Sequence, residues 1–337
     1  MLGRCRFRIR KIAMFRNSCL LCTINTIVII CIICITLFHI NVSTRNSNPT
    51  YRDIDRENIY RDNIQNIESK REKIDTNVRI NECLNDGSEN LPPLYVITPT
   101  YRRSEQLAEL TRLSNTLMLV PNLHWLVIED AYKTNDLITE LLERTGIKYE
   151  YLTAPMPEQY KKKKGTKPRG VSNRNKGLDW IRENAKTGVF YFADDDNSYD
   201  LQLFREIRYT KRVSMFPVGL VTKFGVSTPV IRNGQFIEFY DGWLGGRKFP
   251  VDMAGFAVSV QFLLERPQAS MPYTPGFEED GFLKSLKPFE PKEIEFMASN
   301  CTKIYVWHTQ TKKNEPSSPL ADKFNNTNVY LLKQILV

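Results

Sequence analysis

The sequence lacks the short motifs by which many nucleotide-binding folds hold phosphate. Neither a Gly-x-Gly-x-x-Gly fingerprint nor a Walker loop occurs among its 337 residues. This absence argues against a dinucleotide-binding fold and against a P-loop enzyme. An Asp-x-Asp-x-Thr pattern, which would indicate a Mg²⁺ phosphohydrolase, is also absent. Any phosphate that this chain binds must therefore be met by a metal ion and by cationic side chains.

Cysteine is scarce outside the N-terminal region. Five of the seven cysteines lie within the first 34 residues, which leaves only Cys83 and Cys301 for the rest of the chain. Two cysteines do not make a disulfide scaffold. They could pair with each other, pair across a dimer, or remain free thiols.

Charge is absent from residues 18–40, a run of 23 residues. About 20 apolar residues span a bilayer, whereas the apolar part of a cleavable signal peptide has roughly 7–15. The first 16 residues carry six Arg and Lys side chains and no acid, so this flank should stay cytoplasmic. We predict a single-pass type II membrane protein, with a cytoplasmic tail at 1–17 and a signal anchor at 18–40. A slowly cleaved signal peptide is the alternative.

Residues 41–93 are polar and are predicted to form a lumenal stem. A short heptad-like series within it could make the protein a homodimer, although a solvated linker fits the pattern at least as well. The series is Tyr60, Ile64, Ile67, Ile74 and Val78. The net charge of +9 comes largely from the N-terminal flank, because residues 41–93 have a net charge of −2. The remaining charge of the lumenal part suits anionic sugars or nucleotides and does not indicate a nucleic-acid partner.

From residue 94 onward, predicted strands and helices alternate. Short apolar runs are expected to form strands at residues 94–98, 125–129, 147–152, 189–193 and 218–222. Helices are expected at residues 104–118, 135–144, 171–183 and 201–210. This alternation predicts an α/β fold in which helices flank a parallel sheet. The second half contains more Gly and Pro, which predicts a mixed sheet with long loops.

Three groups of polar side chains follow predicted strands. They are Pro99-Thr100-Tyr101 after the first strand, Asp130 after the second, and Asp194-Asp195-Asp196 after the fourth. Ligands bind outside the carboxyl ends of strands in open α/β sheets, so these groups should line one crevice. Adjacent carboxylates repel one another unless a cation lies among them, and hard oxygen ligands favour Mg²⁺ or Mn²⁺. We predict a nucleotide site, and an acidic turn that caps the next helix is the alternative.

Polar and cationic side chains suit the parts of such a ligand. Asp130 fits a hydrogen bond to a base or ribose, and Tyr101 could stack on a base. Arg169 and Arg174 flank the N-terminus of the helix predicted at 171–183, which itself favours anions. A basic loop lies beside them, and a solvated, flexible loop is an equally good interpretation. Its members are Lys161, Lys162, Lys163, Lys164 and Lys167.

Six stretches, in order through residues 94–313, match one known family. They are Val96–Tyr101, His124–Asp130, Pro168–Val171 with Arg174-Asn175, Phe192–Asn197, Phe249–Val258, and Asn300–Ile304 with Val306–Thr309. Several are long and unusual in sequence, which argues against chance. Through them the sequence resembles the animal β-1,3-glucuronosyltransferases.

The resemblance implies a GT-A fold, in which a Rossmann-like donor half is joined to a mixed-sheet acceptor half, with residues 94–337 as the catalytic domain. It implies an inverting transfer of glucuronic acid from UDP-glucuronate to the 3-hydroxyl of a terminal galactose on a glycan or proteoglycan. Mn²⁺ is the implied cofactor, and the Golgi membrane is the implied location. Synthesis of the glycosaminoglycan–protein linkage region, or of a related glycan, is the implied role.

The resemblance also implies roles for individual residues. The implied metal ligand is Asp196. The implied donor-binding residues are Pro99, Thr100, Tyr101, Asp130, Arg169, Arg174, Asp194, Asp195 and His308. The implied acceptor-side residues are Trp243, Arg247 and Asp252. A buried structural histidine is the alternative for His308, and a core aromatic is the alternative for Trp243. Three sequons, at Asn41, Asn300 and Asn325, would accept N-glycans if lumenal and exposed.

Inversion requires one displacement and one general base. The segment Gly276–Leu283 resembles the family's catalytic-glutamate stretch, which places the base at Glu279, with Glu278 as second choice. Two positions depart from the family pattern: Gln310 replaces an arginine, and Ser227 replaces a glutamate on the acceptor side. They leave open a same-fold enzyme with another sugar, such as a xylosyltransferase, or an inactive membrane-anchored glycan-binding relative.

Overall fold

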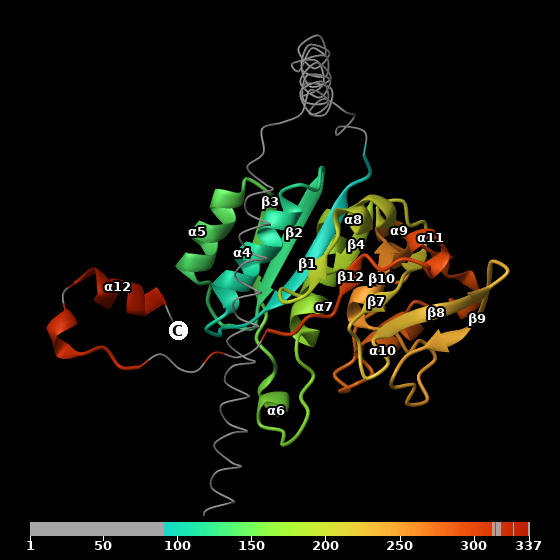
Figure 1. Cartoon of the computed structure of the whole chain (residues 1–337). Coiled ribbons are helices and arrows are strands. Elements are labelled where there is room, and N and C mark those ends of the chain that lie inside the picture. Colours follow the sequence, from blue (N-terminus) through green and yellow to red (C-terminus); the bar gives the residue numbers. More distant parts are fainter. Residues whose placement is uncertain (1–90, 312–313, 315–317, 326, 336–337) are drawn as a thin grey trace, which may run out of the picture. The chain divides into compact units, whose positions relative to one another are not determined.

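The computed structural model describes residues 91–311, 314, 318–325 and 327–335 (Figure 1). The predicted cytoplasmic tail, the signal anchor, nearly all of the stem and the sequon at Asn41 lie outside these residues. Within the described part, no helix has both the length and the apolar character that a membrane span requires.

A seven-stranded sheet lies at the centre of the described structure, in the order β3-β2-β1-β4-β10-β6-β11. Its strands are β1 (Leu94–Thr100), β2 (Leu123–Glu129), β3 (Lys148–Thr153), β4 (Val189–Phe192), β6 (Val213–Met215), β10 (Phe256–Ser259) and β11 (Glu295–Phe296). Strands β1 to β4 run parallel, as predicted. Strand β10 is antiparallel to both of its neighbours, which makes the whole sheet mixed.

Helices cover both faces of this sheet (Figure 1). One face carries α4 (Gln106–Leu117), α5 (Asp136–Thr145) and α8 (Leu201–Ile207), and the other carries α7 (Val171–Asn184), α9 (Val260–Leu264) and α10 (Glu278–Ser285). Successive side chains of a strand point to opposite faces of the sheet, so the core is divided into one layer on each face. On β1, Val96 packs with α4 while its neighbour Ile97 packs with α7, and both side chains are fully buried. The predicted α/β fold, with helices on a largely parallel sheet, is therefore confirmed.

A second sheet has five strands in the order β5-β12-β7-β8-β9. Its strands are β5 (Ser198–Tyr199), β7 (Val218–Gly219), β8 (Val226–Arg232), β9 (Gln235–Tyr240) and β12 (Val306–Trp307). The strand predicted at 218–222 was wrong in length, because it ends at Gly219. Leu220 and Thr222 have φ angles of 62° and 53°, which no β-strand residue adopts. The helix predicted at 201–210 also ends early, at Ile207, whose carbonyl accepts a 2.7 Å hydrogen bond from Thr210 Oγ1.

The remaining elements are short. They are α6 (Glu158–Lys161), α11 (Ala298–Cys301), α12 (Asn328–Ile335) and three 3₁₀ turns at Met253–Gly255, Pro291–Glu293 and Asp322–Phe324. The sequon residues Asn300 and Asn325 are both exposed. Cys301 forms no disulfide within the described residues, and burial raises the pKa of its thiol to about 12. Cys83 lies outside the described residues.

Candidate functional site

A cavity of about 360 Å³ opens at the carboxyl ends of β1, β2 and β4 and at the N-terminus of α7. All three polar groups that follow the predicted strands line it, together with both predicted arginines. The predicted residues in its wall are Pro99, Thr100, Tyr101, Asp130, Arg169, Arg174, Asp194, Asp195 and Asp196. The expectation that these side chains converge on one crevice is confirmed.

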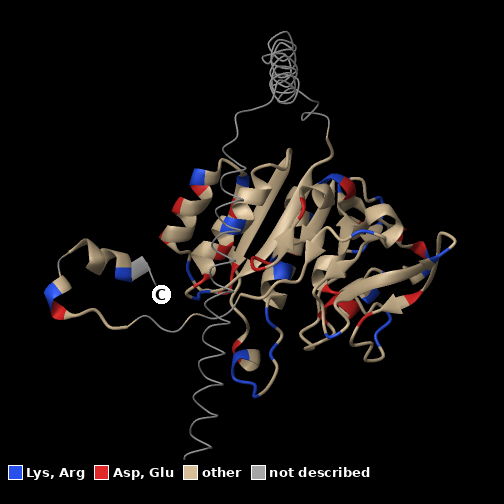
Figure 2. Ribbon diagram, viewed as in Figure 1, with Lys and Arg blue, Asp and Glu red and all other residues tan. Residues whose placement is uncertain are grey.

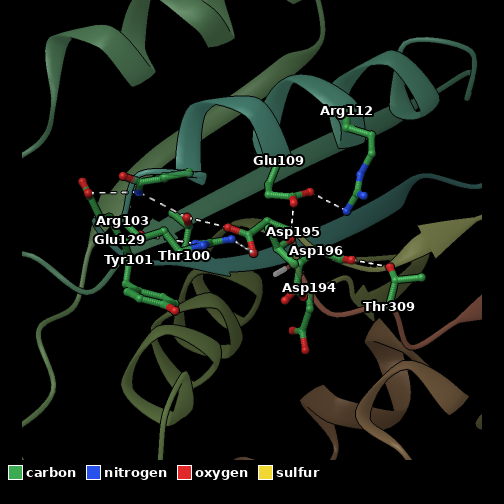
Figure 3. Close-up of polar contacts among 12 residues, drawn as sticks. Thr100, Tyr101, Arg103, Glu109, Arg112, Glu129, Asp194, Asp195, Asp196 and Thr309 are labelled. Carbon is green, nitrogen blue, oxygen red and sulfur yellow. Dashed lines mark hydrogen bonds and ion pairs between the residues drawn. The ribbon is translucent and has the colours of Figure 1, made fainter. Parts of the chain in front are cut away.

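Asp195 is the buried member of the acidic triplet (Figure 3). Its two carboxylate oxygens accept hydrogen bonds from Thr100 Oγ1 and from Arg103 Nη2, each at 2.7 Å. Burial raises the pKa of Asp195 above its ordinary value, and the bond from Arg103 opposes that rise. Asp195 therefore joins β1 to β4, and Arg103 compensates its charge.

Asp194 is balanced by a different arginine. Its carboxylate forms an ion pair with Arg174, which α7 presents from its first turn and which is only 6% exposed. The backbone carbonyl of Asp194 accepts a 2.8 Å hydrogen bond from the Tyr199 hydroxyl. Two of the three acids thus have a cationic partner.

Asp196 has no such partner. Its backbone carbonyl accepts a hydrogen bond from Thr309 Oγ1, but no ion pair or hydrogen bond among the described residues reaches its carboxylate. Burial raises the pKa of Asp196, and the charges of Asp194 and Asp195 raise it further. A cation beside this carboxylate would relieve that repulsion.

No group of three or more His, Cys, Asp or Glu side chains in the described part of the chain has a geometry that would hold a metal ion by itself. A metal at Asp196 must then take most of its ligands from phosphate oxygens and water. Mg²⁺ and similar hard cations commonly bind in this way, through one or two carboxylates and a substrate phosphate. The available carboxylate of Asp196 fits such a cation.

The N-terminus of α7 opens into the same cavity. Gly170 precedes it with a φ of 73°, and no side chain caps the free N–H groups of the first turn. A Cβ atom at this position would lie 2.4 Å from Arg174 Nη1, so a larger residue here would have to shift this guanidinium. Exposed Arg169 adds a further positive charge at the wall. Free N–H groups at a helix N-terminus beside two arginines form a site for an anion such as phosphate.

The far wall of the cavity is less charged. Asp130 Oδ1 accepts a 2.8 Å hydrogen bond from the Met156 backbone N–H, which fixes the carboxylate at the rim. Tyr101 is 41% exposed, and the Arg103 guanidinium lies 4.7 Å from its ring centre. An aromatic ring and a fixed acceptor at this wall suit a flat, polar ring system.

The predicted lysine loop does not line this cavity within the described residues. Figure 2 shows Lys and Arg positions, in blue, along the ribbon at and after α6, and the side chains of Lys162, Lys163 and Lys164 are exposed. Lys167 Nζ donates a 2.6 Å hydrogen bond to the carbonyl of Lys161. This geometry agrees with the solvated-loop interpretation.

His308 and Asp252 form an ion pair next to the acidic triplet. Nδ1 of His308 lies 3.0 Å from Oδ2 of Asp252. The contact with Asp252 raises the pKa of His308 to about 9, while burial acts in the opposite direction. The charges of Asp194 and Asp196 raise it further. The imidazole is therefore positively charged at neutral pH.

Glu279 stands in the first turn of α10 and is half-buried. Burial raises its pKa to about 7, and the charges of Asp252 and Glu278 add to the rise, while Arg174 opposes it. Glu279 thus lies within electrostatic range of both Asp252 and Arg174. A carboxylate with a pKa close to neutral is suited to take a proton as a general base.

Asp280 is the next acid in the same turn, and both of its carboxylate oxygens contact other residues of the chain. Its Oδ1 accepts hydrogen bonds from the backbone N–H groups of Lys248 and Phe249, at 2.7 and 2.9 Å. Its Oδ2 lies 2.6 Å from Lys284 Nζ, and the residue is 1% exposed. Asp280 anchors α10 and has no free oxygen for a substrate.

Trp243 is 45% exposed, which excludes the core-aromatic alternative. Its ring lies edge-on to Phe277, with 5.6 Å between centres. Arg247 is buried beneath it: the guanidinium lies 4.4 Å from the tryptophan ring centre and forms a 3.1 Å ion pair with buried Asp241. Arg247 therefore shapes this side of the site by holding Trp243.

The two departures from the family pattern differ in exposure. Gln310 is exposed. Ser227 is 2% exposed, and its Oγ accepts a 3.3 Å hydrogen bond from the backbone N–H of Asp252. Ser227 consequently faces inward and offers no group to a ligand.

Sequence reasoning missed the polar network behind the triplet. Gln106 Nε2 donates to Thr100 Oγ1 at 3.2 Å and to buried Glu129 Oε1 at 3.1 Å, and Tyr151 donates to the other Glu129 oxygen at 2.5 Å. Arg103 could have been found, because it lies in the same post-strand loop as Tyr101. Gln106 gave no such signal, since its partner Glu129 lies 23 residues further along the chain.

The fold and the cavity define an α/β protein that binds its ligand at the carboxyl ends of parallel strands. Residues 113–312 match the profile of Glycosyltransferase family 43. The chain belongs to this family, which confirms the resemblance seen in its sequence.

Three relatives show how similar the chain is to named proteins. It is 62% identical over 247 residues to galactosylgalactosylxylosylprotein 3-beta-glucuronosyltransferase P of Drosophila melanogaster, covering 73% of this chain and 52% of the relative. It is 52% identical over 226 residues to galactosylgalactosylxylosylprotein 3-beta-glucuronosyltransferase S of the same organism, and this match covers 67% of this chain and 55% of the relative. Galactosylgalactosylxylosylprotein 3-beta-glucuronosyltransferase 2 of Homo sapiens is 45% identical over 238 residues, and this match covers 67% of this chain and 72% of the relative. The chain thus spans about half the length of its two Drosophila relatives.

Among solved structures, Staphylococcus aureus TarS 1–349 is 15% identical to this chain, with a TM-score of 0.40. The overlap covers 64% of this chain and 60% of that chain.

Proposed function

We propose that this chain transfers glucuronic acid from UDP-glucuronate to the 3-hydroxyl of a terminal galactose, with inversion at the anomeric carbon. The names of its relatives support this donor and this linkage. The observation that carries the proposal is Glu279, whose pKa is about 7 and which lies within electrostatic range of both Arg174 and Asp252. Phe277, which directly precedes α10, packs against the exposed ring of Trp243, so Glu279 stands on the helix that begins beside this ring.

The donor lies in the cavity of this proposal. Uridine occupies the wall formed by Tyr101 and Asp130, and the diphosphate meets the N-terminus of α7 with Arg169 and Arg174. Asp196 holds the divalent cation, which we propose to be Mn²⁺ and which, when bound, neutralises charge on the departing diphosphate.

The acceptor approaches from the opposite side, over Trp243. Glu279 takes the proton of the acceptor hydroxyl as that oxygen forms its bond to the anomeric carbon. The bond between the anomeric carbon and the diphosphate oxygen breaks, and UDP leaves with the electron pair. The charged imidazole of His308, held by Asp252, adds positive charge near the leaving group.

The proposal also covers the setting of the enzyme. The fold is assigned to the GT-A type, because a parallel donor half is followed by a mixed acceptor half. We propose that the chain lies in the Golgi membrane as a type II protein anchored by residues 18–40. We also propose that it is a homodimer that acts on a glycan or proteoglycan in linkage-region synthesis. The uncharged run and the polar residues 41–93 support the anchored topology.

The decisive test is a donor panel. The full chain is incubated with Mn²⁺, a galactose-terminated acceptor, and UDP-glucuronate, UDP-xylose or UDP-N-acetylglucosamine in turn. We expect transfer from UDP-glucuronate alone, with a β-configured product. Preferential transfer of xylose would assign the chain to another donor. Binding of UDP without any transfer would indicate an inactive glycan-binding relative.

A further inference from the structure

One segment, Ala269–Tyr273, joins the helix of the anion site to the helix that carries Glu279. It lies between α9 and α10 in the chain, and side chains of α7 hold it by hydrogen bonds. We propose that Asn175, which follows Arg174 on α7, is a positioning residue that sets the carboxylate of Glu279 in place relative to the donor. This inference rests on the proposed function.

Both polar atoms of the Asn175 side chain bind the backbone of a single residue in this segment. Nδ2 donates a 2.9 Å hydrogen bond to the carbonyl of Met271, and Oδ1 accepts a 2.8 Å hydrogen bond from the Met271 backbone N–H. Met271 is 1% exposed and packs in the same core layer as α7 and α10. Because loss of a partner in a buried place is costly, this pair of bonds fixes the backbone at Met271.

A second contact holds the end of the segment. The Tyr273 hydroxyl and Ser172 Oγ form a 3.0 Å hydrogen bond, and Ser172 stands in the first turn of α7. The Tyr273 ring also stacks on Tyr160 of α6, with 4.7 Å between centres and 2° between planes. Ser172 and Asn175 are three residues apart, so they lie on one face of α7. The segment is therefore attached to that face at two points.

The same segment contacts α10. A Cβ atom at Gly281 would lie 2.3 Å from Pro272 Cγ, so the segment and the helix pack closely at this point. The Phe277 backbone N–H donates a 3.0 Å hydrogen bond to the carbonyl of Thr274, directly before the helix begins. Gly281 follows Glu279 by two residues. A displacement of Pro272 would consequently be passed to the turn that carries Glu279.

Two neighbouring residues of α7 thus serve the two sides of the proposed reaction. Arg174 lines the anion-binding cavity, and Asn175 holds the segment that packs on α10. A general base must come within about 2.6–3.2 Å of the atom whose proton it takes. A misplacement of about 1 Å can lower the rate about 10²-fold. Fixing both groups from one helix keeps Glu279 in register with the donor.

The test is a double-mutant cycle in the full chain with UDP-glucuronate, Mn²⁺ and a galactose-terminated acceptor. Asn175→Ala should lower kcat about ten- to a hundredfold, with little change in the calorimetric affinity for UDP. In the Glu279→Gln background, the same substitution should lower kcat less than about twofold, because the group that it positions is already gone.

Two further variants complete the experiment. Asn184→Ala is the matched control, because Asn184 is exposed at the end of α7 and its Nδ2 donates only within the helix, to the carbonyl of Trp180 at 2.9 Å. It should keep the wild-type kcat. Tyr273→Phe keeps the stack on Tyr160 and loses the bond to Ser172, so kcat should fall about two- to tenfold. It replaces Asn175→Ala in the cycle if that variant does not fold.

Three results would overturn the inference. They are a wild-type kcat in Asn175→Ala, equal losses of kcat in both backgrounds, and a loss of UDP affinity as large as the loss of kcat. If the wild type transfers no glucuronic acid, the proposed function fails separately. The pKa of Glu279, measured by NMR, then decides. A fall towards 4.5 in Asn175→Ala supports the positioning role, and an unchanged pKa contradicts it.

Discussion

Asp194, Asp195 and Asp196 are chemically identical, yet each has a different environment. Asp195 is paired with Arg103 and Asp194 with Arg174, whereas no side-chain partner among the described residues reaches Asp196. Unpaired carboxylates in a partly buried site are costly unless a cation is bound there. The functional difference between these neighbours follows from their partners.

Asp196→Asn should abolish metal-dependent UDP binding and leave the fold intact. The substitution removes one hard anionic ligand, and no internal contact of that carboxylate is lost. Calorimetry with UDP and Mn²⁺ measures the binding. Asp195→Asn is the matched control, because it removes the partner of Arg103 and should lower the unfolding temperature. Wild-type UDP affinity in Asp196→Asn would contradict the metal assignment.

The raised pKa of Glu279 also predicts a pH dependence of stability. The group is neutral when folded up to about pH 7, whereas its unfolded pKa is 4.5. The resulting stabilisation is complete below pH 4.5 and is lost as the pH rises through 7. Glu279→Gln cannot ionise, so at pH 8 it should be more stable than the wild type by about 1–3 kcal/mol. Urea unfolding at pH 5 and pH 8 measures the difference, and an equal difference at both values would contradict burial of an ionisable group.

At the scale of elements, α7 is the most informative. Its N-terminus faces the cavity, and Gly170 and Arg174 on its first turns shape the anion site. A helix was predicted at 171–183, and the four parallel strands were predicted from short apolar runs, because such runs are local features of the sequence. The strand predicted at 218–222 failed because its end depends on left-handed backbone angles at Leu220 and Thr222. A leucine or a threonine in a sequence does not indicate a left-handed backbone angle.

Gly170→Ala should weaken UDP binding several-fold. The added methyl group meets Arg174 Nη1 at 2.4 Å and must displace it from Asp194. Gly165→Ala is the control: Gly165 also has a positive φ, of 86°, but nothing lies within 4 Å of its Cβ position. Both variants should lose about 1 kcal/mol of stability from backbone strain. Equal UDP affinities in the two variants would show that Arg174 does not meet the ligand.

At the scale of the whole molecule, the site is assembled from segments far apart in sequence. The contributing segments are the loop after β1, the triplet after β4, the first turn of α10 and, near the C-terminus, His308. The sequence predicted the donor side, because strand ends of a parallel sheet meet at one edge. It could not predict the Gln106–Glu129 network, since hydrogen bonds between distant segments depend on the register of the folded sheet.

Residues Gly87–Val337 form one compact unit. A protein lacking residues 1–80 retains this whole unit, so we expect it to be soluble and to keep the wild-type kcat. Circular dichroism checks folding, and the transfer assay checks turnover. A folded but inactive truncation would mean that the N-terminal segment contributes to catalysis.

The central claim is that Glu279 is the general base. Gln keeps the shape of this side chain but cannot accept the proton, so Glu279→Gln should lower kcat by about 10²–10⁴-fold with little change in UDP affinity. Glu278→Gln is the matched neighbour in the same helical turn and should retain most of the wild-type kcat. Full turnover by Glu279→Gln, with Glu278→Gln inactive or equally active, would contradict the assignment.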